Sequence, residues 1–196
     1  MSVRLLLFLL LITFPLCNLK AQNERIVDSL TRELKKAKDP EAKFKLYQKL
    51  SPLVEPMDKY KSSILLNAEL SNNTDLQLRT YVLLSQLSSP EAAPLYLDKM
   101  FALAKEKKNE EYQGWYYLFK GGVHYYEKGN STKAIELLRE ANAIAVDKQL
   151  DTLAYEVLRL TSFIHSSKGE RLLEYKTYMQ QLSLAEKIGE IGRAHV

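Results

Sequence analysis

A dense run of aromatic residues in the middle of the chain is the feature best suited to bind a partner. Between residues 112 and 126 the sequence carries Tyr112, Trp115, Tyr116, Tyr117, Phe119, Tyr125 and Tyr126. Aromatic side chains offer a large apolar surface, and tyrosine and tryptophan add a polar group, so these residues are favoured at binding interfaces. The chemistry predicted from this run is therefore non-covalent recognition.

Residues that could perform catalysis or hold a metal are sparse. The chain has one cysteine, Cys17, and no H-E-x-x-H, G-x-S-x-G or phosphate-binding glycine loop. We therefore expect no enzyme, no cofactor and no metal site. One alternative is a metal-binding pair of His124 and His165. Another is an acid–base site that combines His124 with Glu127 and Glu156.

The elements that position these side chains are predicted to be helices. Apolar residues recur at helical spacing along most of the chain, and no stretch alternates as a strand does. Helix starts are indicated at Asp39, Thr74 and Ser89, whose side chains can cap a helix. Pro94 should distort the second turn of the helix that follows Ser89. The pattern predicts an all-α chain of about nine helices with short connections.

The aromatic run belongs to a predicted helical hairpin over residues 115–146. Its turn falls at Gly129, and Ser131 is expected to cap the second helix. Two helix backbones approach closely only where no large side chain separates them. Gly122 and Ala134 are predicted to mark that point of close approach.

Six residues of this hairpin follow a known repeat pattern: Leu118, Gly121, Gly122, Tyr125, Ala134 and Leu138. The pattern resembles the tetratricopeptide repeat, whose signature is W-x2-L-G-x2-Y, then A-x3-F and a proline. Val146 stands about where that proline is expected. Similar spacing recurs about 40 residues to either side, a longer period than the 34 of the family. The resemblance implies antiparallel hairpins stacked as a right-handed solenoid, and the competing interpretation is an ordinary helical bundle.

The resemblance also implies a concave groove lined by the first helix of each hairpin. The residues on that face are Tyr116, Phe119, Val123 and Tyr126, and the matching positions of the next repeat include Glu156, Arg159 and Phe163. These seven residues are the candidates for partner binding. The alternative is that Tyr116 and Phe119 pack against a neighbouring hairpin.

Residues 1–21 have the outline of a secretory signal peptide. Arg4 precedes an apolar run that is short for a membrane span, and Ala21 offers a small residue for cleavage. We expect export to the periplasm or the extracytoplasmic face of the membrane. Alternatives are a retained N-terminal anchor and a lipid attached to Cys17. Cleavage after Ala21 would remove the only cysteine, so no disulfide is expected.

Residues 190–196, EIGRAHV, resemble an in-frame translation of a sequencing-library adaptor. We expect this tail to be non-native, with a native tail as the alternative. The repeat domain is therefore assigned to residues 22–189, and the natural chain is expected to continue beyond it.

Charge and architecture together predict a protein or peptide as the partner. The net charge is +4, and residues 1–21 contain two basic residues and no acid, so a charge of +2 stays with the remainder. Such a balanced surface argues against nucleic acid as the binding partner. Attachment to a membrane is expected only through a retained N-terminus or a missing downstream segment. By resemblance, the chain would be the sensor part of a histidine kinase or helix-turn-helix regulator. The alternative is a stand-alone module that binds a small ligand or glycan.

Overall fold

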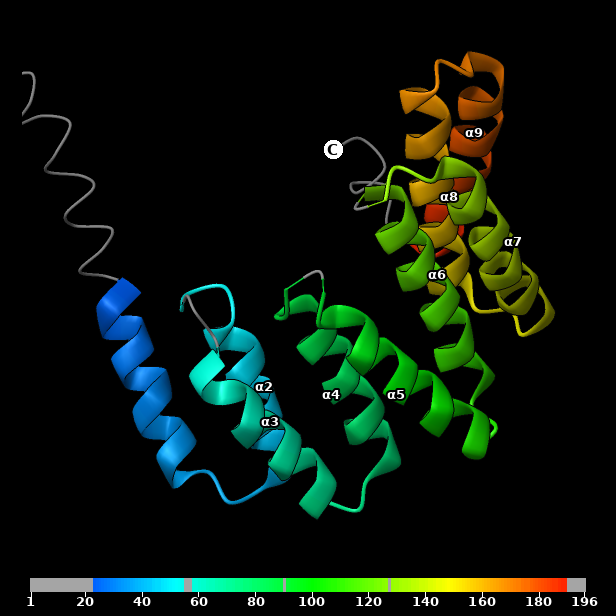
Figure 1. Ribbon diagram of the computed structural model, residues 1–196. Helices are drawn as coiled ribbons and strands as arrows, with labels where there is room; N and C mark the ends of the chain where they lie inside the picture. Colours follow the sequence, from blue (N-terminus) through cyan, green and yellow to red (C-terminus); the bar gives the residue numbers. More distant parts are fainter. Residues whose placement is uncertain (1–22, 55–57, 90, 127, 190–196) are drawn as a thin grey trace, which may run out of the picture. The chain divides into compact units, whose positions relative to one another are not determined.

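The computed structural model describes residues 23–54, 58–89, 91–126 and 128–189, and these contain helices and no strand. The helices are residues 23–36, α2 (Pro40–Leu50), α3 (Asp58–Leu70), α4 (Thr74–Gln86), α5 (Ala93–Glu106), α6 (Glu110–Tyr126), α7 (Ser131–Asp147), α8 (Asp151–Ser167) and α9 (Arg171–Lys187) (Figure 1). The all-α prediction is confirmed for this part of the chain. The predicted signal peptide and the suspected tail lie outside the described residues.

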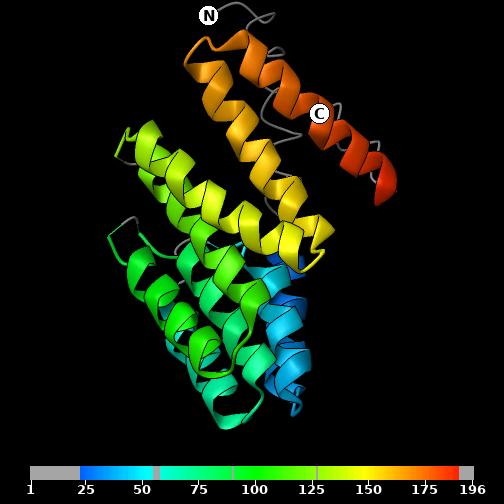
Figure 2. The same cartoon turned by 90° about the vertical axis from the view of Figure 1, so that its right-hand side faces the viewer.

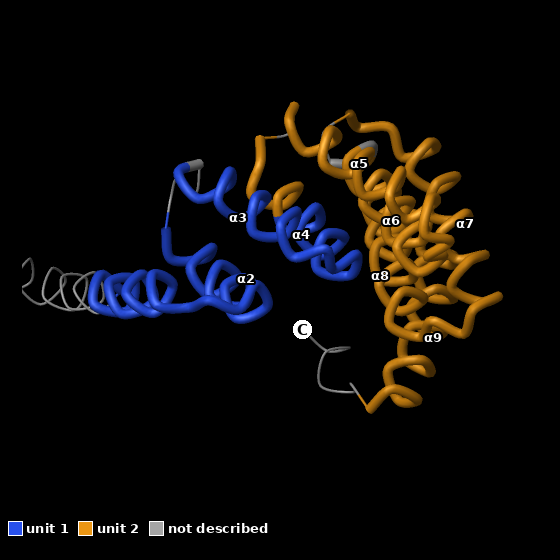
Figure 3. Tube along the Cα trace, turned by 90° about the horizontal axis from the view of Figure 1, so that it is seen from below, with its two compact units in different colours: residues 1–83 blue, residues 84–196 orange. Residues whose placement is uncertain are grey.

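The chain divides into two compact units, residues 1–83 and 84–196 (Figure 3). The division falls inside α4 and not in a linker. None of the described helices combines the length and the apolar character that crossing a bilayer requires.

In unit 1, the start of α2 follows the sequence closely. Asp39 Oδ2 accepts a hydrogen bond from the backbone N–H of Ala42 at 2.8 Å, and Pro40 occupies the first turn. The helix α2 packs against α3. Apolar residues of the two helices recur at helical spacing and are buried: Phe44, Tyr47, Leu50, Ile64 and Ala68.

Two predictions about helix starts were wrong. The cap of α4 is Asn73, whose Oδ1 accepts from the N–H of Leu76 at 3.1 Å, and Thr74 is already the first helical residue. The helix α5 begins at Ala93 and not at Ser89, so Pro94 lies in its first turn. A proline in the first turn displaces no intrahelical hydrogen bond, so the reason to expect a distortion does not apply.

In unit 2, consecutive helices from α5 to α9 pack against each other, and α6 also contacts α8. Figure 2 shows α8 and α9 side by side, joined by a short turn. Small residues of α7 face large ones of α6 and α8. The buried residues that form this core are Leu118, Ala134, Leu138, Ala141, Ala145, Leu153, Val157, Leu160 and Ile164.

The close approach of α6 and α7 is made by Gly121 and not by Gly122. A Cβ at Gly121 would lie 3.2 Å from Leu138 Cγ and 3.3 Å from the carbonyl oxygen of Ala134. A Cβ at Gly122 would meet only Leu160 Cδ2, at an ordinary 3.8 Å. Gly122 therefore faces α8, and the predicted pairing of Gly122 with Ala134 was wrong by one residue.

The turn between α6 and α7 also differs in detail from the prediction. Gly129 has a φ of +60°, which glycine adopts without strain. Asn130, not Ser131, is the cap: its Oδ1 accepts from the N–H of Lys133 at 2.9 Å.

Candidate functional site

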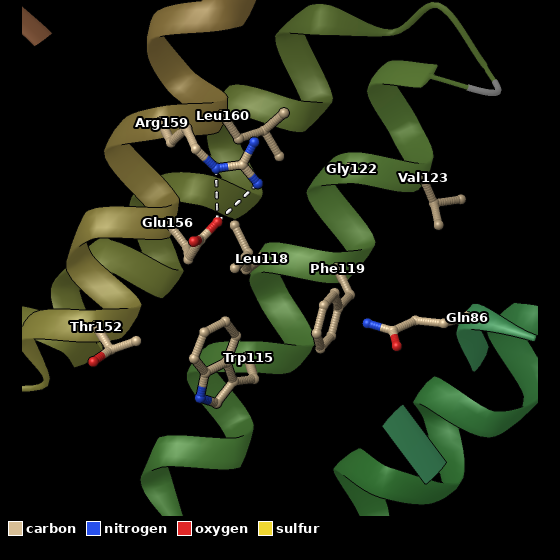
Figure 4. Close-up of a pocket in the computed structure, with 10 residues that line it drawn as sticks. All are labelled: Gln86, Trp115, Leu118, Phe119, Gly122, Val123, Thr152, Glu156, Arg159 and Leu160. Atoms are coloured by element: carbon tan, nitrogen blue, oxygen red, sulfur yellow. Dashed lines mark hydrogen bonds and ion pairs between the residues drawn. The ribbon is translucent and has the colours of Figure 1, made fainter. Parts of the chain in front are cut away.

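A cavity of about 540 Å³ lies in unit 2 between α6 and α8, at the end of α4 (Figure 4). This volume is in the range of small-molecule binding sites. Its lining residues are Gln86, Trp115, Leu118, Phe119, Gly122, Val123, Thr152, Glu156, Arg159 and Leu160.

The α6 wall of the cavity is apolar and aromatic. The spacing of Trp115, Phe119 and Val123 is one residue every helical turn, which places the three side chains along one stripe of α6. The rings of Trp115 and Phe119 are stacked, with centroids 5.9 Å apart and planes 25° apart. Both side chains are half-buried. The absent side chain of Gly122 keeps the floor beside them open.

The α8 wall of the cavity is polar. Glu156 Oε2 accepts from both Nε and Nη2 of Arg159, each at 2.8 Å. The Arg159 side chain is 62% exposed and the Glu156 side chain 30%, so solvent weakens their attraction. Only one carboxylate oxygen takes part in the pair, and Thr152 adds a hydroxyl one turn earlier on the same helix. The cavity thus sets an aromatic surface against charged hydrogen-bonding groups.

Four of the seven residues predicted from the sequence lie together in this cavity. Phe119 and Val123 come from α6, and Glu156 and Arg159 come from α8. The side chain of Tyr126 lies outside the described part of the chain, so its position is left open.

Tyr116 faces α5 and does not line the cavity. Its ring stacks on Phe101 with centroids 4.1 Å apart and planes 17° apart. Its hydroxyl donates to Asp98 Oδ1 at 3.2 Å. Tyr116 therefore packs on the preceding helix, as the alternative interpretation described. Phe163 lies farther along α8, where its ring meets Tyr125 edge-on at 5.9 Å and stays 53% exposed.

The contact of Tyr116 with α5 includes an ion pair. Lys120 Nζ lies 2.8 Å from Asp98 Oδ1. Burial raises the pKa of the Tyr116 hydroxyl. Burial alone would lower the pKa of Lys120, but hydrogen bonds with Asp98 and Tyr116 more than offset this and raise it. These polar groups satisfy one another and hold α6 against α5.

Trp115, Thr152 and Gln86 line the cavity but were not among the predicted site residues. Trp115 precedes Phe119 by one turn of α6. Thr152 likewise precedes Glu156 by one turn, so helical spacing alone could have found both. Gln86 belongs to α4, and its presence here depends on packing that spacing does not show.

His165 forms an ion pair with a residue at the start of the next helix. His165 Nδ1 lies 2.7 Å from Glu170 Oε2, where it links the end of α8 to the start of α9. The described residues contain no group of three or more potential ligands from His, Cys, Asp and Glu. The side chain of His124 lies outside the part of the chain that the structure describes.

Comparison with known proteins gives no relative for this chain. No family model, no curated protein and no solved structure matches it.

Proposed function

We propose that this chain is a helical-repeat scaffold whose cavity between α6 and α8 binds a segment of another protein. The observation that carries the proposal is the pairing of the Trp115–Phe119 surface with the Glu156–Arg159 pair across one cavity. Aromatic and arginine side chains supply most of the binding energy at protein interfaces. An apolar peptide side chain would rest on the aromatic rings, while the charged pair would bind polar groups beside it.

The proposed architecture is a right-handed solenoid of the tetratricopeptide type. Two facts support it. The helices α6, α7, α8 and α9 each have 17 residues, so two hairpins of equal helix length follow each other. The first helix of one hairpin, α6, also contacts the first helix of the next, α8. Stacked hairpins make such contacts between successive repeats.

Selection from a phage-displayed library of random peptides tests the peptide-binding proposal. We expect selected peptides to share an aromatic or large aliphatic residue flanked by charge. Phe119→Ala and Arg159→Ala should each weaken binding by tenfold or more in fluorescence anisotropy, which corresponds to about 1.4 kcal/mol. Tyr175→Ala is the matched control, because Tyr175 is a 61% exposed aromatic residue of α9 outside the cavity. Peptides that bind Phe119→Ala as tightly as the wild type would refute the proposed site.

A glycan is the second candidate ligand, and the stacked rings of Trp115 and Phe119 favour it. A flat aromatic surface can contact the apolar face of a sugar, while Thr152, Glu156 and Arg159 can hydrogen bond to its hydroxyls. A glycan array separates the two candidates. An oligosaccharide that binds, loses its affinity in Trp115→Ala and is not displaced by selected peptides would favour the glycan.

We further propose that the scaffold is exported and is the sensor or interaction part of a longer signalling protein. The support is the signal-like pattern of residues 1–21 and the resemblance to repeats that serve this role. Expression with the native N-terminus, followed by cell fractionation and N-terminal sequencing, tests the export. A mature N-terminus at Gln22 in the periplasmic fraction is the expected result, and an unprocessed cytoplasmic chain would contradict it.

A further inference from the structure

A second cavity, in unit 1, combines a cationic rim with an apolar wall. It has a volume of about 520 Å³ and lies between the end of the helix at 23–36, the start of α2 and the face of α3. Its lining residues are Leu34, Lys35, Ala37, Lys38, Pro40, Lys43, Tyr47, Ser63, Leu66, Asn67 and Leu70. This site lies entirely within unit 1 and is independent of the cavity in unit 2.

The rim carries three positive charges and no negative one. Lys35, Lys38 and Lys43 line the cavity, and no carboxylate does. None of the three lysines forms an ion pair with a described residue. Three like charges around one space repel each other, and an anion between them would relieve that repulsion.

Three acidic residues lie close to these lysines in sequence, and each has another partner. Glu33 Oε1 accepts from the Ser29 hydroxyl at 3.4 Å. The Asp39 carboxylate accepts from the N–H of Ala42 and so caps α2. Glu41 forms a bidentate pair with Arg79, at 2.9 Å and 2.6 Å. The hydrogen bonds from Arg79 hold the pKa of Glu41 below its ordinary value, so this carboxylate stays charged and committed to α4. The cationic rim is thus left without an internal partner.

The rest of the lining favours an apolar tail over a peptide backbone. Leu66 and Leu70 are 54% and 74% exposed, so both have apolar surface to cover. A bound peptide would bring N–H and C=O groups that need partners. Of the uncharged polar groups, Tyr47 is already hydrogen bonded to Ser63, and Asn67 Nδ2 donates to the carbonyl oxygen of Pro40 at 2.9 Å.

We propose that this cavity binds a single-chain amphiphile with an anionic head group, either a carboxylate or a phosphate. The head group binds among Lys35, Lys38 and Lys43, since a lysine ammonium is a compact point charge that pairs with either anion. The alkyl chain covers Leu34, Leu66 and Leu70, which supplies the hydrophobic part of the affinity.

Isothermal titration calorimetry on the purified chain tests the site with dodecanoate and dodecyl phosphate, each below its critical micelle concentration. Both should bind with one site per chain, and dodecyltrimethylammonium should not bind. The triple variant Lys35→Ser, Lys38→Ser, Lys43→Ser should weaken both anions at least tenfold. The matched control removes three exposed lysines of unit 2, Lys99→Ser, Lys108→Ser and Lys176→Ser, and should bind as the wild type does.

Other probes separate this site from a general attraction to anions or membranes. Inorganic phosphate that binds as tightly as dodecyl phosphate would overturn the proposal, because the apolar wall would then contribute nothing. Phosphatidylglycerol vesicles that bind while both monomeric amphiphiles fail would also overturn it, in favour of a membrane surface. Thermal unfolding of each variant checks the fold. Should the triple variant unfold, Lys38→Ser alone must weaken both amphiphiles, and Leu66→Ser must do the same.

Discussion

Two adjacent glycines of α6 should respond in opposite ways to the same substitution. Gly121→Ala and Gly122→Ala each add one methyl group to the interior of the same helix. In either case alanine favours the helix by up to about 1 kcal/mol over glycine. Any difference between the two variants therefore reports what the added methyl group meets in the folded protein.

The structure predicts the size of that difference. At Gly122 the methyl group meets only Leu160 Cδ2 at 3.8 Å, so the helical gain is kept and stability should rise by about 0.5–1 kcal/mol. At Gly121 it would press against Leu138 and the backbone oxygen of Ala134, which cannot move without shifting α7. Overpacking costs typically about 1–3 kcal/mol, which offsets or exceeds the helical gain. The two variants should differ by roughly 1–3 kcal/mol.

Urea denaturation monitored by tryptophan fluorescence measures this difference. The chain has one tryptophan, Trp115, which lies in unit 2 on the same helix as both glycines, so the signal reports the relevant unit. In thermal unfolding the expected gap is about 2–12 °C, at about 2–4 °C per kcal/mol for a chain of this size. Equal stabilisation by both substitutions would refute the close approach of α6 and α7 at Gly121.

Three further predictions concern the cap of α7, the ion pair of Glu41 with Arg79, and the cavity of unit 2. Asn130→Ala should lower the stability of unit 2 by about 1 kcal/mol, because it removes the cap of α7. Ser131→Ala should change the stability by less than about 0.5 kcal/mol, and urea titrations measure both effects. Glu41→Gln should destabilise unit 1 at neutral pH. Because the Arg79 hydrogen bonds lower the pKa of Glu41, the stabilities of wild type and variant should converge as pH falls below the ordinary carboxyl pKa of 4.5. Thermal melts followed by circular dichroism across that pH range test this. A divergence at low pH would contradict that assignment. A ligand bound in the cavity of unit 2 should remove water from the half-buried Trp115 and so shift its fluorescence emission to shorter wavelength. A selected ligand that leaves the emission spectrum unchanged does not bind in this cavity.

Helices and their starts could be predicted from the sequence where local chemistry decides them. Asp39 before a proline specifies the start of α2, and Asn109 specifies that of α6, where its Oδ1 accepts from the N–H of Tyr112 at 3.1 Å. The start was misplaced where two capping residues are neighbours. Asn73 and Thr74 could each cap α4, and only the backbone conformation, set by packing, selects Asn73.

The faces of α6 could be predicted less well, because three different neighbours surround it. Successive residues of a helix point about 100° apart, so a one-residue error in the rotation of α6 exchanges one neighbour for another. This explains why Gly122 was assigned the role of Gly121. Tyr116 and Phe119 are three residues apart, which places them only about 60° apart around the helix. The boundary between two neighbours falls between them, so the first packs on α5 and the second lines the cavity.

The arrangement of α6 also explains how a helix so rich in aromatic residues can fold and still bind a partner. Its contact with α7 includes Leu118 and Gly121, and its contact with α5 includes Tyr116, through ring stacking and a hydrogen bond. Trp115 and Phe119 stay half-buried and line the cavity. Because Gly122 has no side chain on the α8 side, α8 leaves space beside those rings instead of filling it. The aromatic surface that a ligand can reach is therefore the part of the half-buried Trp115 and Phe119 rings that borders this space.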